Sequence, residues 1–298
     1  MFPETENDVK TPVIEFRKVS LSFDHKPALI DVSFELQRGQ LILVTGASES
    51  GKSVLLRLAS GLLPPDEGQI LIEGREIQNL DESALLQIRE RSMGIVFQDQ
   101  SVFTALSVFD NAAYRLDERG WPEEMIEPAV LETLDFVGLQ DDTKKIPEEL
   151  SVGMRRRLEF ARAVVGWPPI MLFDEPTAGL DPINARMMMD LIIRARNEHG
   201  ISSLYVTKEM HEIPYLDARW SRSNGTANTV FRGAAAAAEN DTKLLLLERG
   251  KVCFLGSVAD FQSSSMPAVT RMTRPEPGAP YADSYVADPW NRKRKGIL

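Results

Sequence analysis

Hydrophobic and polar residues alternate through the first part of the chain. Residues 13–23 carry apolar side chains at about every second position, and residues 28–36 repeat the pattern. A period of two is typical of strands that bury one face. Turn-forming residues stand at 25–27 and 38–39. The pattern predicts two or three antiparallel strands.

Further along, short apolar runs alternate with helical segments. Met154, Leu158, Ala161 and Val165 recur at the spacing that places them on one face of a helix. Alternating strands and helices indicate a mostly parallel α/β sheet. The predicted strands are 41–45, 69–73, 94–97, 170–173, 201–206 and 244–247, and helices are expected at 54–59, 85–91 and about 183–199.

Domain boundaries follow from the segments that lack such periods. One domain is expected over 13–265, with a helical subdomain at about 99–166 and an exposed insertion at about 219–241, which is low in bulky apolar residues. Residues 1–12 are predicted to be an N-terminal tail. Residues 266–298 are predicted to be a C-terminal tail, because they contain several prolines and a basic run near the end.

A complete G-x-x-x-x-G-K-[ST] motif follows the apolar run 41–44 and precedes a helical segment. This strand, glycine-rich turn and helix start is the setting in which the motif binds phosphates. Lys52 would reach the β- and γ-phosphates, and the Ser53 hydroxyl would bind Mg²⁺. The predicted nucleotide-binding residues of the loop are Gly46, Ala47, Ser48, Glu49, Ser50, Gly51, Lys52 and Ser53.

The charge balance narrows the choice of partner. The chain has 34 Lys and Arg against 44 Asp and Glu, a net charge of −10, which argues against nucleic acid as the main partner. The single cysteine, Cys253, excludes an internal disulfide and fits a reducing compartment. No apolar run approaches the roughly 18 residues that span a bilayer. Membrane association is therefore expected to need a partner.

Two carboxylates end the apolar run 170–173. Asp174 and Glu175 would lie where a buried strand opens at the ligand face of an α/β sheet. Asp174 is placed to hold the water shell of Mg²⁺, and Glu175 to polarise the water that attacks the γ-phosphate. A carboxylate pair at a loop start is usually only solvated, but the phosphate loop changes that interpretation.

Six blocks together resemble the ATP-binding subunit of ATP-binding-cassette (ABC) transporters. They are similar to the adenine-stacking aromatic residue (Phe23), the Walker A loop (46–53), the Q-loop glutamine (Gln98), the signature (150–154), Walker B (170–175) and the D-loop (178–181). The resemblance covers about 13–218 and resumes at about 243–265. It implies an α/β fold of the P-loop NTPase class. This fold has a RecA-like, mostly parallel sheet, an antiparallel β subdomain and an inserted helical subdomain.

The resemblance further implies a site shared by two subunits that meet head to tail. Each ATP would lie between the Walker A loop of one subunit and Ser151, Val152 and Gly153 of the other. As a good N-cap, Ser151 would present its hydroxyl and the next N–H groups to a γ-phosphate. In the same scheme Gln98 joins the Mg²⁺ and catalytic site, and Asp181 the nucleotide site.

Two departures from the family pattern stand out. Val152 replaces the usual first signature glycine, and Lys208 replaces the switch histidine that contacts the γ-phosphate. Lysine donates to phosphate as a point charge but cannot accept a hydrogen bond. We therefore expect Lys208 to keep a contact with the γ-phosphate and to alter hydrolysis. The alternative interpretation is that Lys208 is a solvated surface lysine.

A narrower resemblance concerns the cargo. Met154 and the arginines after it are similar to the subgroup that energises lipid transport with MCE-domain proteins, the Mla type. The leading hypothesis is an ATPase subunit, homodimeric or paired with a related subunit, on the inner face of a membrane through a permease. A soluble ABC ATPase and a degenerate nucleotide-binding regulator stay open as alternatives. The single phosphate loop argues against the first, and intact Lys52, Asp174 and Glu175 argue against the second.

Overall fold

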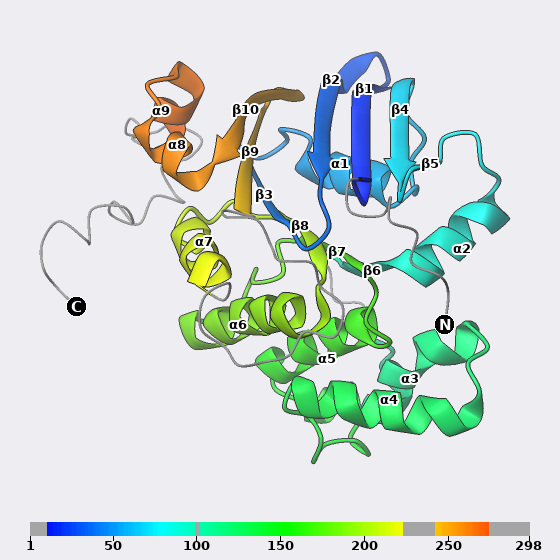
Figure 1. The fold of residues 1–298 in the computed structure, drawn as a ribbon. Coiled ribbons are helices and arrows are strands. Elements are labelled where there is room, and N and C mark those ends of the chain that lie inside the picture. The colour runs from blue at the N-terminus through cyan, green and yellow to red at the C-terminus, as the bar shows by residue number, and fades with distance from the viewer. Residues whose placement is uncertain (1–10, 99–101, 223–241, 274–298) are drawn as a thin grey trace, which may run out of the picture. The chain divides into compact units, whose positions relative to one another are not determined.

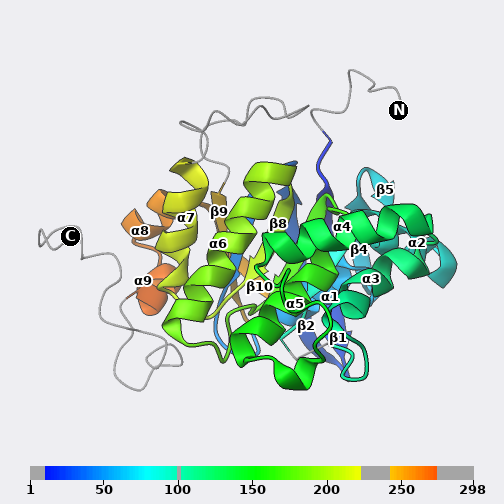
Figure 2. The same ribbon diagram turned by 90° about the horizontal axis from the view of Figure 1, so that it is seen from below.

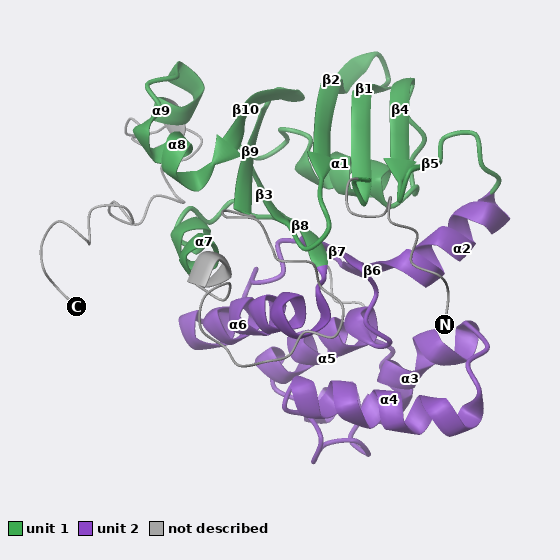
Figure 3. Cartoon of the chain, viewed as in Figure 1, with its two compact units in different colours: residues 1–81, 202–298 green, residues 82–201 purple. Residues whose placement is uncertain are grey.

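The structure is a computed structural model that describes residues 11–98, 102–222 and 242–273. The chain divides into two compact units, residues 1–81 with 202–298 and residues 82–201 (Figure 3). Residues 1–10 of the predicted N-terminal tail lie outside the described residues. So do most of the predicted insertion and the tail from residue 274, with its basic run.

The first unit contains an antiparallel sheet in the order β2-β1-β4-β5 (Figure 1). Its strands are β1 (Ile14–Phe23), β2 (Lys26–Leu36), β4 (Glu67–Ile72) and β5 (Arg75–Glu76). Ile14 lies opposite Leu36 on one side and Ile72 on the other, and all three are buried. The predicted alternation is thus confirmed, because the apolar residues face a common core.

The same unit contains a second group of strands in the order β10-β9-β3-β8. Every residue of the parallel strands β3 (Leu41–Thr45) and β8 (Ser202–Val206) is buried, as expected for strands covered on both faces. β9 (Thr242–Glu248) extends the parallel set, and β10 (Lys251–Ser257) pairs antiparallel at its edge. β10 was not predicted, because its half-buried residues show no clear alternation.

The described residues of this unit form four helices. α1 (Lys52–Ala59) follows β3, and α7 (Glu212–Arg222) follows β8. α7 reaches Arg222, so the first residues of the predicted insertion are helical. α8 (Val258–Ser263) and α9 (Pro267–Thr273) follow β10, and α9 occupies the start of the segment that the sequence assigned to the C-terminal tail.

The second unit has a pair of parallel strands and five α-helices within its described residues. β6 (Met93–Val96) pairs with β7 (Ile170–Asp174), and α2 (Glu82–Ser92) precedes β6. α3 (Val108–Glu118), α4 (Glu123–Phe136) and α5 (Val152–Val164) pack together (Figure 2). The short 3-10 helix η1 (Pro147–Glu149) leads into α5, and α6 (Pro182–His199) follows β7. None of the helices in the described part of the chain is long and apolar enough to cross a bilayer.

A stack of rings joins α4 and α6 in the second unit. The Trp167 and His199 rings lie 3.3 Å apart between centroids and almost parallel, with Phe136 edge-on to both. The Arg194 guanidinium covers Phe136 at 4.2 Å. Partial burial lowers the pKa of His199, and the positive charge of Arg194 acts in the same direction. The negative charges of Glu132 and Glu198 oppose this shift.

This histidine predicts a pH-dependent stability. Because the folded-state pKa of His199 lies below its ordinary value, the unfolded chain binds more protons near that value. The contribution is complete above pH about 6.5 and is lost as the pH falls through the lowered value. We expect His199→Phe, which keeps a ring on Trp167, to reduce the loss of unfolding free energy between pH about 7.5 and 5.5, measured by urea denaturation. The same substitution at exposed His25 is the control; an unchanged slope in His199→Phe would contradict the assignment.

Candidate nucleotide-binding site

The phosphate loop of residues 46–53 connects β3 to α1 and lies close to neighbouring backbone. Gly46 and Gly51 have φ of 152° and 105°, and a Cβ at these positions would lie 2.2 Å from the Leu247 carbonyl oxygen and 2.6 Å from that of Ala28. Only glycine fits such approaches without a shift of the backbone. The two glycines therefore hold the loop against β9 and β2.

Lys52 is buried inside this loop. Its Nζ donates to the carbonyl oxygens of Gly46 and Ala47, at 2.9 and 2.7 Å. A lysine ammonium is otherwise almost always exposed, so these carbonyl dipoles compensate for the loss of hydration. The positive charge is thus concentrated at the loop, where a phosphate group would need it.

The turn between β9 and β10 supports the phosphate loop, a role that was not predicted from the sequence. The Gly250 N–H donates to the Ser50 carbonyl at 3.1 Å, and the Gly250 carbonyl accepts from the Ile30 N–H at 2.8 Å. A Cβ on Gly250 would lie 2.7 Å from the Ala28 carbonyl oxygen. The Arg249–Gly250 pair marks a turn in the sequence, but only the fold shows what the turn contacts.

The end of β8 brings Lys208 to the start of the phosphate loop. The Thr207 N–H donates to the Val44 carbonyl at 3.0 Å, two residues before Gly46. Buried Glu212 accepts from the hydroxyls of Tyr205 and Thr207, at 3.0 and 2.7 Å. Lys208 is exposed and follows directly from this anchored segment. Glu212 was not identified from the sequence, where it is one of many acidic helix-start residues.

Phe23 completes the set of predicted residues in the first unit. It ends β1, lies opposite Lys26 across the hairpin turn, and is 46 % exposed. Ala28 and Leu29, farther along β2, contact the phosphate loop through Gly51. An exposed ring on the hairpin that supports the loop is available for stacking on a base.

The second unit contains the remaining predicted residues, beginning with the carboxylates after β7. Asp174 is the last residue of that strand and is 9 % exposed. Glu175 follows with φ of 47°, a left-handed conformation that is uncommon for a residue with a side chain. The Ala178 N–H donates to the Glu175 carbonyl at 3.0 Å and closes a turn. The chain thus turns sharply where the acidic pair begins.

The signature segment and the D-loop form one cluster in this unit. The Ser151 hydroxyl caps α5 by accepting from the Met154 N–H at 3.2 Å. A Cβ on buried Gly153 would lie 2.1 Å from Oδ1 of Asn184. Asn184 was missed, because its partner is distant in sequence. By contrast, Val152 is 48 % exposed, so its side chain meets solvent.

Asn184 also fixes the D-loop aspartate. Its Nδ2 donates to Oδ2 of Asp181 at 2.5 Å, and the N–H groups of Ile183 and Asn184 donate to Oδ1 at 2.9 and 3.0 Å. These hydrogen bonds, that from the Asn184 carboxamide first, lower the pKa of Asp181. The Asn184 contacts thus link Asp181 to the signature turn. Gln98, the remaining predicted residue of this unit, is exposed and lies two residues after the end of β6.

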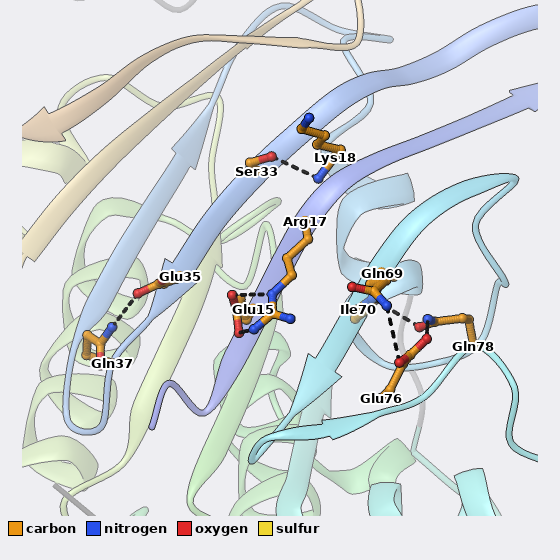
Figure 4. Close-up of polar contacts among 10 residues, drawn as sticks. All are labelled: Glu15, Arg17, Lys18, Ser33, Glu35, Gln37, Gln69, Ile70, Glu76 and Gln78. Atoms are coloured by element: carbon orange, nitrogen blue, oxygen red, sulfur yellow. Dashed lines mark hydrogen bonds and ion pairs between the residues drawn. The ribbon is translucent and has the colours of Figure 1, made fainter. Parts of the chain in front are cut away.

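A shallow hollow of about 770 Å³ lies on the antiparallel sheet, and no residue of the phosphate loop lines it. Polar groups along it interact with one another: the Arg17 guanidinium donates to the Glu15 carboxylate, and the Lys18 backbone N–H donates to the Ser33 hydroxyl (Figure 4). Beside it, Gln37 donates to Glu35, and Gln69 and Gln78 donate to Glu76. Charges matched in this way are typical of a solvated sheet face, so the candidate site is the loop.

Comparison with protein families decides the class. The family model described as "ABC transporter" matches residues 29–178, which include the phosphate loop, Gln98, the signature and Walker B. The chain belongs to the ABC transporter ATP-binding family. The resemblance found in the sequence is thereby confirmed, and as a member of this family the chain is an ATPase.

Curated relatives differ in what their names say they transport. The chain is 35 % identical over 229 residues to the intermembrane phospholipid transport system ATP-binding protein MlaF of Escherichia coli, which covers 76 % of this chain and 84 % of that protein. It is 37 % identical over 186 residues to the methionine import ATP-binding protein MetN of Carboxydothermus hydrogenoformans, covering 62 % and 55 %. The chain therefore spans about half of that second relative.

Solved structures confirm the fold class. cbiO1 from Clostridium perfringens, part of the ABC transporter complex cbiONQ, has a TM-score of 0.71 at 24 % identity, over 86 % of this chain and 92 % of that chain. A dimeric ATP-binding cassette bound to ADP and Pi has a TM-score of 0.67 at 24 % identity, over 82 % and 98 %. At this identity the likeness shows the ABC cassette fold, as predicted.

Proposed function

We propose that this ABC ATPase couples ATP binding and hydrolysis, at a site shared by two subunits, to a membrane permease that transports lipid. The alignment with MlaF supports the lipid proposal, because it combines 35 % identity with coverage of most of both chains. The methionine import relative at 37 % identity is covered to 55 %, and one that is covered to 72 % is 31 % identical. Methionine or another small solute is the second candidate cargo, favoured by the slightly higher identity.

The roles within the site are proposed from its chemistry. The loop of residues 46–53 binds the phosphates of ATP, and Phe23 stacks on the adenine. Ser151, Val152, Gly153 and Asp181 act from the partner subunit. The proposed Mg²⁺ ligands, Ser53, Gln98 and Asp174, offer hydroxyl, carboxamide and carboxylate oxygens, a donor set that fits this hard cation. Bound Mg²⁺ would neutralise charge on the β- and γ-phosphates.

The permease is proposed to dock on the second unit near residues 98–111. Phe103 and Tyr114 are 37 % and 40 % exposed, and their rings lie 4.6 Å apart. The Arg162 guanidinium covers Phe103 at 4.3 Å. Exposed aromatic rings next to an arginine are enriched in the central parts of protein interfaces. An MCE-domain protein is a further proposed partner, by analogy with the Mla type.

Lys208 tests the proposed geometry of the γ-phosphate. If Lys208 donates to that phosphate, Lys208→Ala should lower ATP turnover by roughly tenfold or more, since one such charged contact is worth about 1.5–3 kcal/mol. Lys208→His should restore part of the rate, because histidine also reaches the phosphate. Steady-state phosphate release by the purified chain and by its membrane complex measures both.

Controls for Lys208 lie within the same chain. Glu175→Gln sets the rate without a general base. Lys18→Ala removes an exposed lysine of β1, on the sheet face that no residue of the phosphate loop lines. Equal turnover in Lys208→Ala, Lys208→His and the wild type would show that Lys208 is a solvated surface residue.

Affinity purification from detergent-solubilised membranes of the source organism tests the proposed cargo. The tagged full-length chain should retain an integral membrane permease, and the eluate should contain bound phospholipid or glycolipid, measured by mass spectrometry. A variant with Phe103 and Tyr114 changed to Ser should lose the permease while keeping ATP affinity. Recovery of a permease with an amino-acid-binding partner and without lipid would favour the second cargo, and recovery of ribosomes or DNA would overturn transport.

A further inference from the structure

One buried arginine of α5 contacts the backbone of the proposed catalytic residue Glu175 and of the residue that precedes Gln98. Arg156 lies five residues after Ser151 and is 4 % exposed. Its Nε donates to the Pro176 carbonyl at 2.8 Å, and its Nη2 to the Glu175 carbonyl at 3.1 Å. Its Nη1 donates to the Phe97 carbonyl at 3.1 Å. One planar guanidinium therefore joins the signature helix, the turn after β7 and the residue before Gln98.

The charge of Arg156 is balanced inside the second unit. Nη1 also donates to Oε2 of Glu159, one helical turn along α5, at 2.5 Å, and both side chains are almost fully buried. A buried guanidinium without an acidic partner would be strongly destabilising. With Glu159 in place, its remaining N–H groups are available to the three carbonyls. Lysine cannot reproduce this arrangement, because its ammonium lacks the planar fork of donors.

The carbonyls that Arg156 holds belong to a strained turn. Glu175 has φ of 47°, and a left-handed conformation of a residue with a Cβ typically carries about 1–2 kcal/mol of strain. Such a conformation persists only where the surroundings fix it. Two consecutive hydrogen bonds from Arg156, to the carbonyls of Glu175 and Pro176, supply that fixation. The direction of the Glu175 side chain follows from the same backbone angles.

We infer that Arg156 is a positioning residue for ATP hydrolysis, which holds Glu175 and the Gln98 segment in one geometry relative to the signature helix. The inference rests on the proposed roles of Glu175 and Gln98. Arg156 touches no nucleotide in this scheme; it acts through the backbone. Because the signature helix carries the guanidinium, a displacement of α5 would be transmitted to the Glu175 turn and to residue 97 together.

Two neighbouring arginines give a matched pair of variants. Arg157, the next residue of α5, is half-buried, and it donates to the carbonyls of Val137 and Gly138 at the end of α4. Arg156→Lys and Arg157→Lys therefore make the same chemical change on the same helix. Only the first removes contacts with residues 97, 175 and 176.

The test measures turnover, ATP affinity and amide exchange in the full-length chain. Arg156→Lys should lower kcat by roughly tenfold or more, as small displacements of catalytic groups do, while the dissociation constant for ATP stays within about twofold. Hydrogen exchange at the Ala178 amide, which donates to the Glu175 carbonyl, should become faster. Arg157→Lys should match the wild type in all three.

Other outcomes overturn the inference. Unchanged kcat, unchanged exchange at Ala178, or an equal loss of ATP affinity would each show that Arg156 does not position Glu175. If Arg156→Lys does not fold, the double variant Arg156→Gln with Glu159→Gln removes the charges together, and the same criteria apply. A wild-type rate no higher than that of Glu175→Gln would instead contradict the proposed role of Glu175, and the exchange at Ala178 would still decide whether Arg156 holds the turn.

Discussion

The burial of the strands decides where chemistry can occur in this chain. Every residue of β3, β7 and β8 is buried, and a strand covered on both faces cannot carry an uncompensated charge. Polar groups must therefore collect where these strands end. The phosphate loop follows β3, the Asp174–Glu175 pair stands at the end of β7, and Lys208 follows β8. The candidate site is a consequence of this constraint within each unit, before any ligand is considered.

The sequence alone was sufficient to predict those parts of the site whose residues are consecutive in the chain. The phosphate loop has its strand, its glycines and its helix within one short stretch, and the structure shows both glycines packed against neighbouring carbonyls. Short apolar runs likewise predicted β3, β7 and β8. Edge strand β10 and helix α9 were missed, because half-exposed residues give no period and the prolines nearby suggested a tail.

Residues that act through distant neighbours could not be found from the sequence. Gly250 supports the phosphate loop, Asn184 fills the space beside Gly153, and Arg156 holds the turn at Glu175. Each resembles an ordinary turn or helix residue until the fold brings its partner close. The site itself, including the roles of Gln98 and Lys208, stays a prediction from motif and chemistry.

The altered signature has a physical explanation within the second unit. Gly153 is retained where a side chain would overlap with Asn184, whereas Val152 stands where a side chain meets solvent. The two glycine positions of the motif are therefore under different constraints. A valine at the exposed position leaves the cap at Ser151 and the close contact at Gly153 intact, so the segment can still serve a nucleotide held by a partner.

The central claim is that one subunit's phosphate loop is completed by the signature of another, and a disulfide between subunits tests it directly. One tagged chain would carry Ser48→Cys and a differently tagged chain Val152→Cys, both with Cys253→Ser and Glu175→Gln. The account predicts a covalent dimer between the two chains that forms with ATP and Mg²⁺ and does not form without nucleotide. Absence of this dimer, although both chains bind ATP, would contradict it.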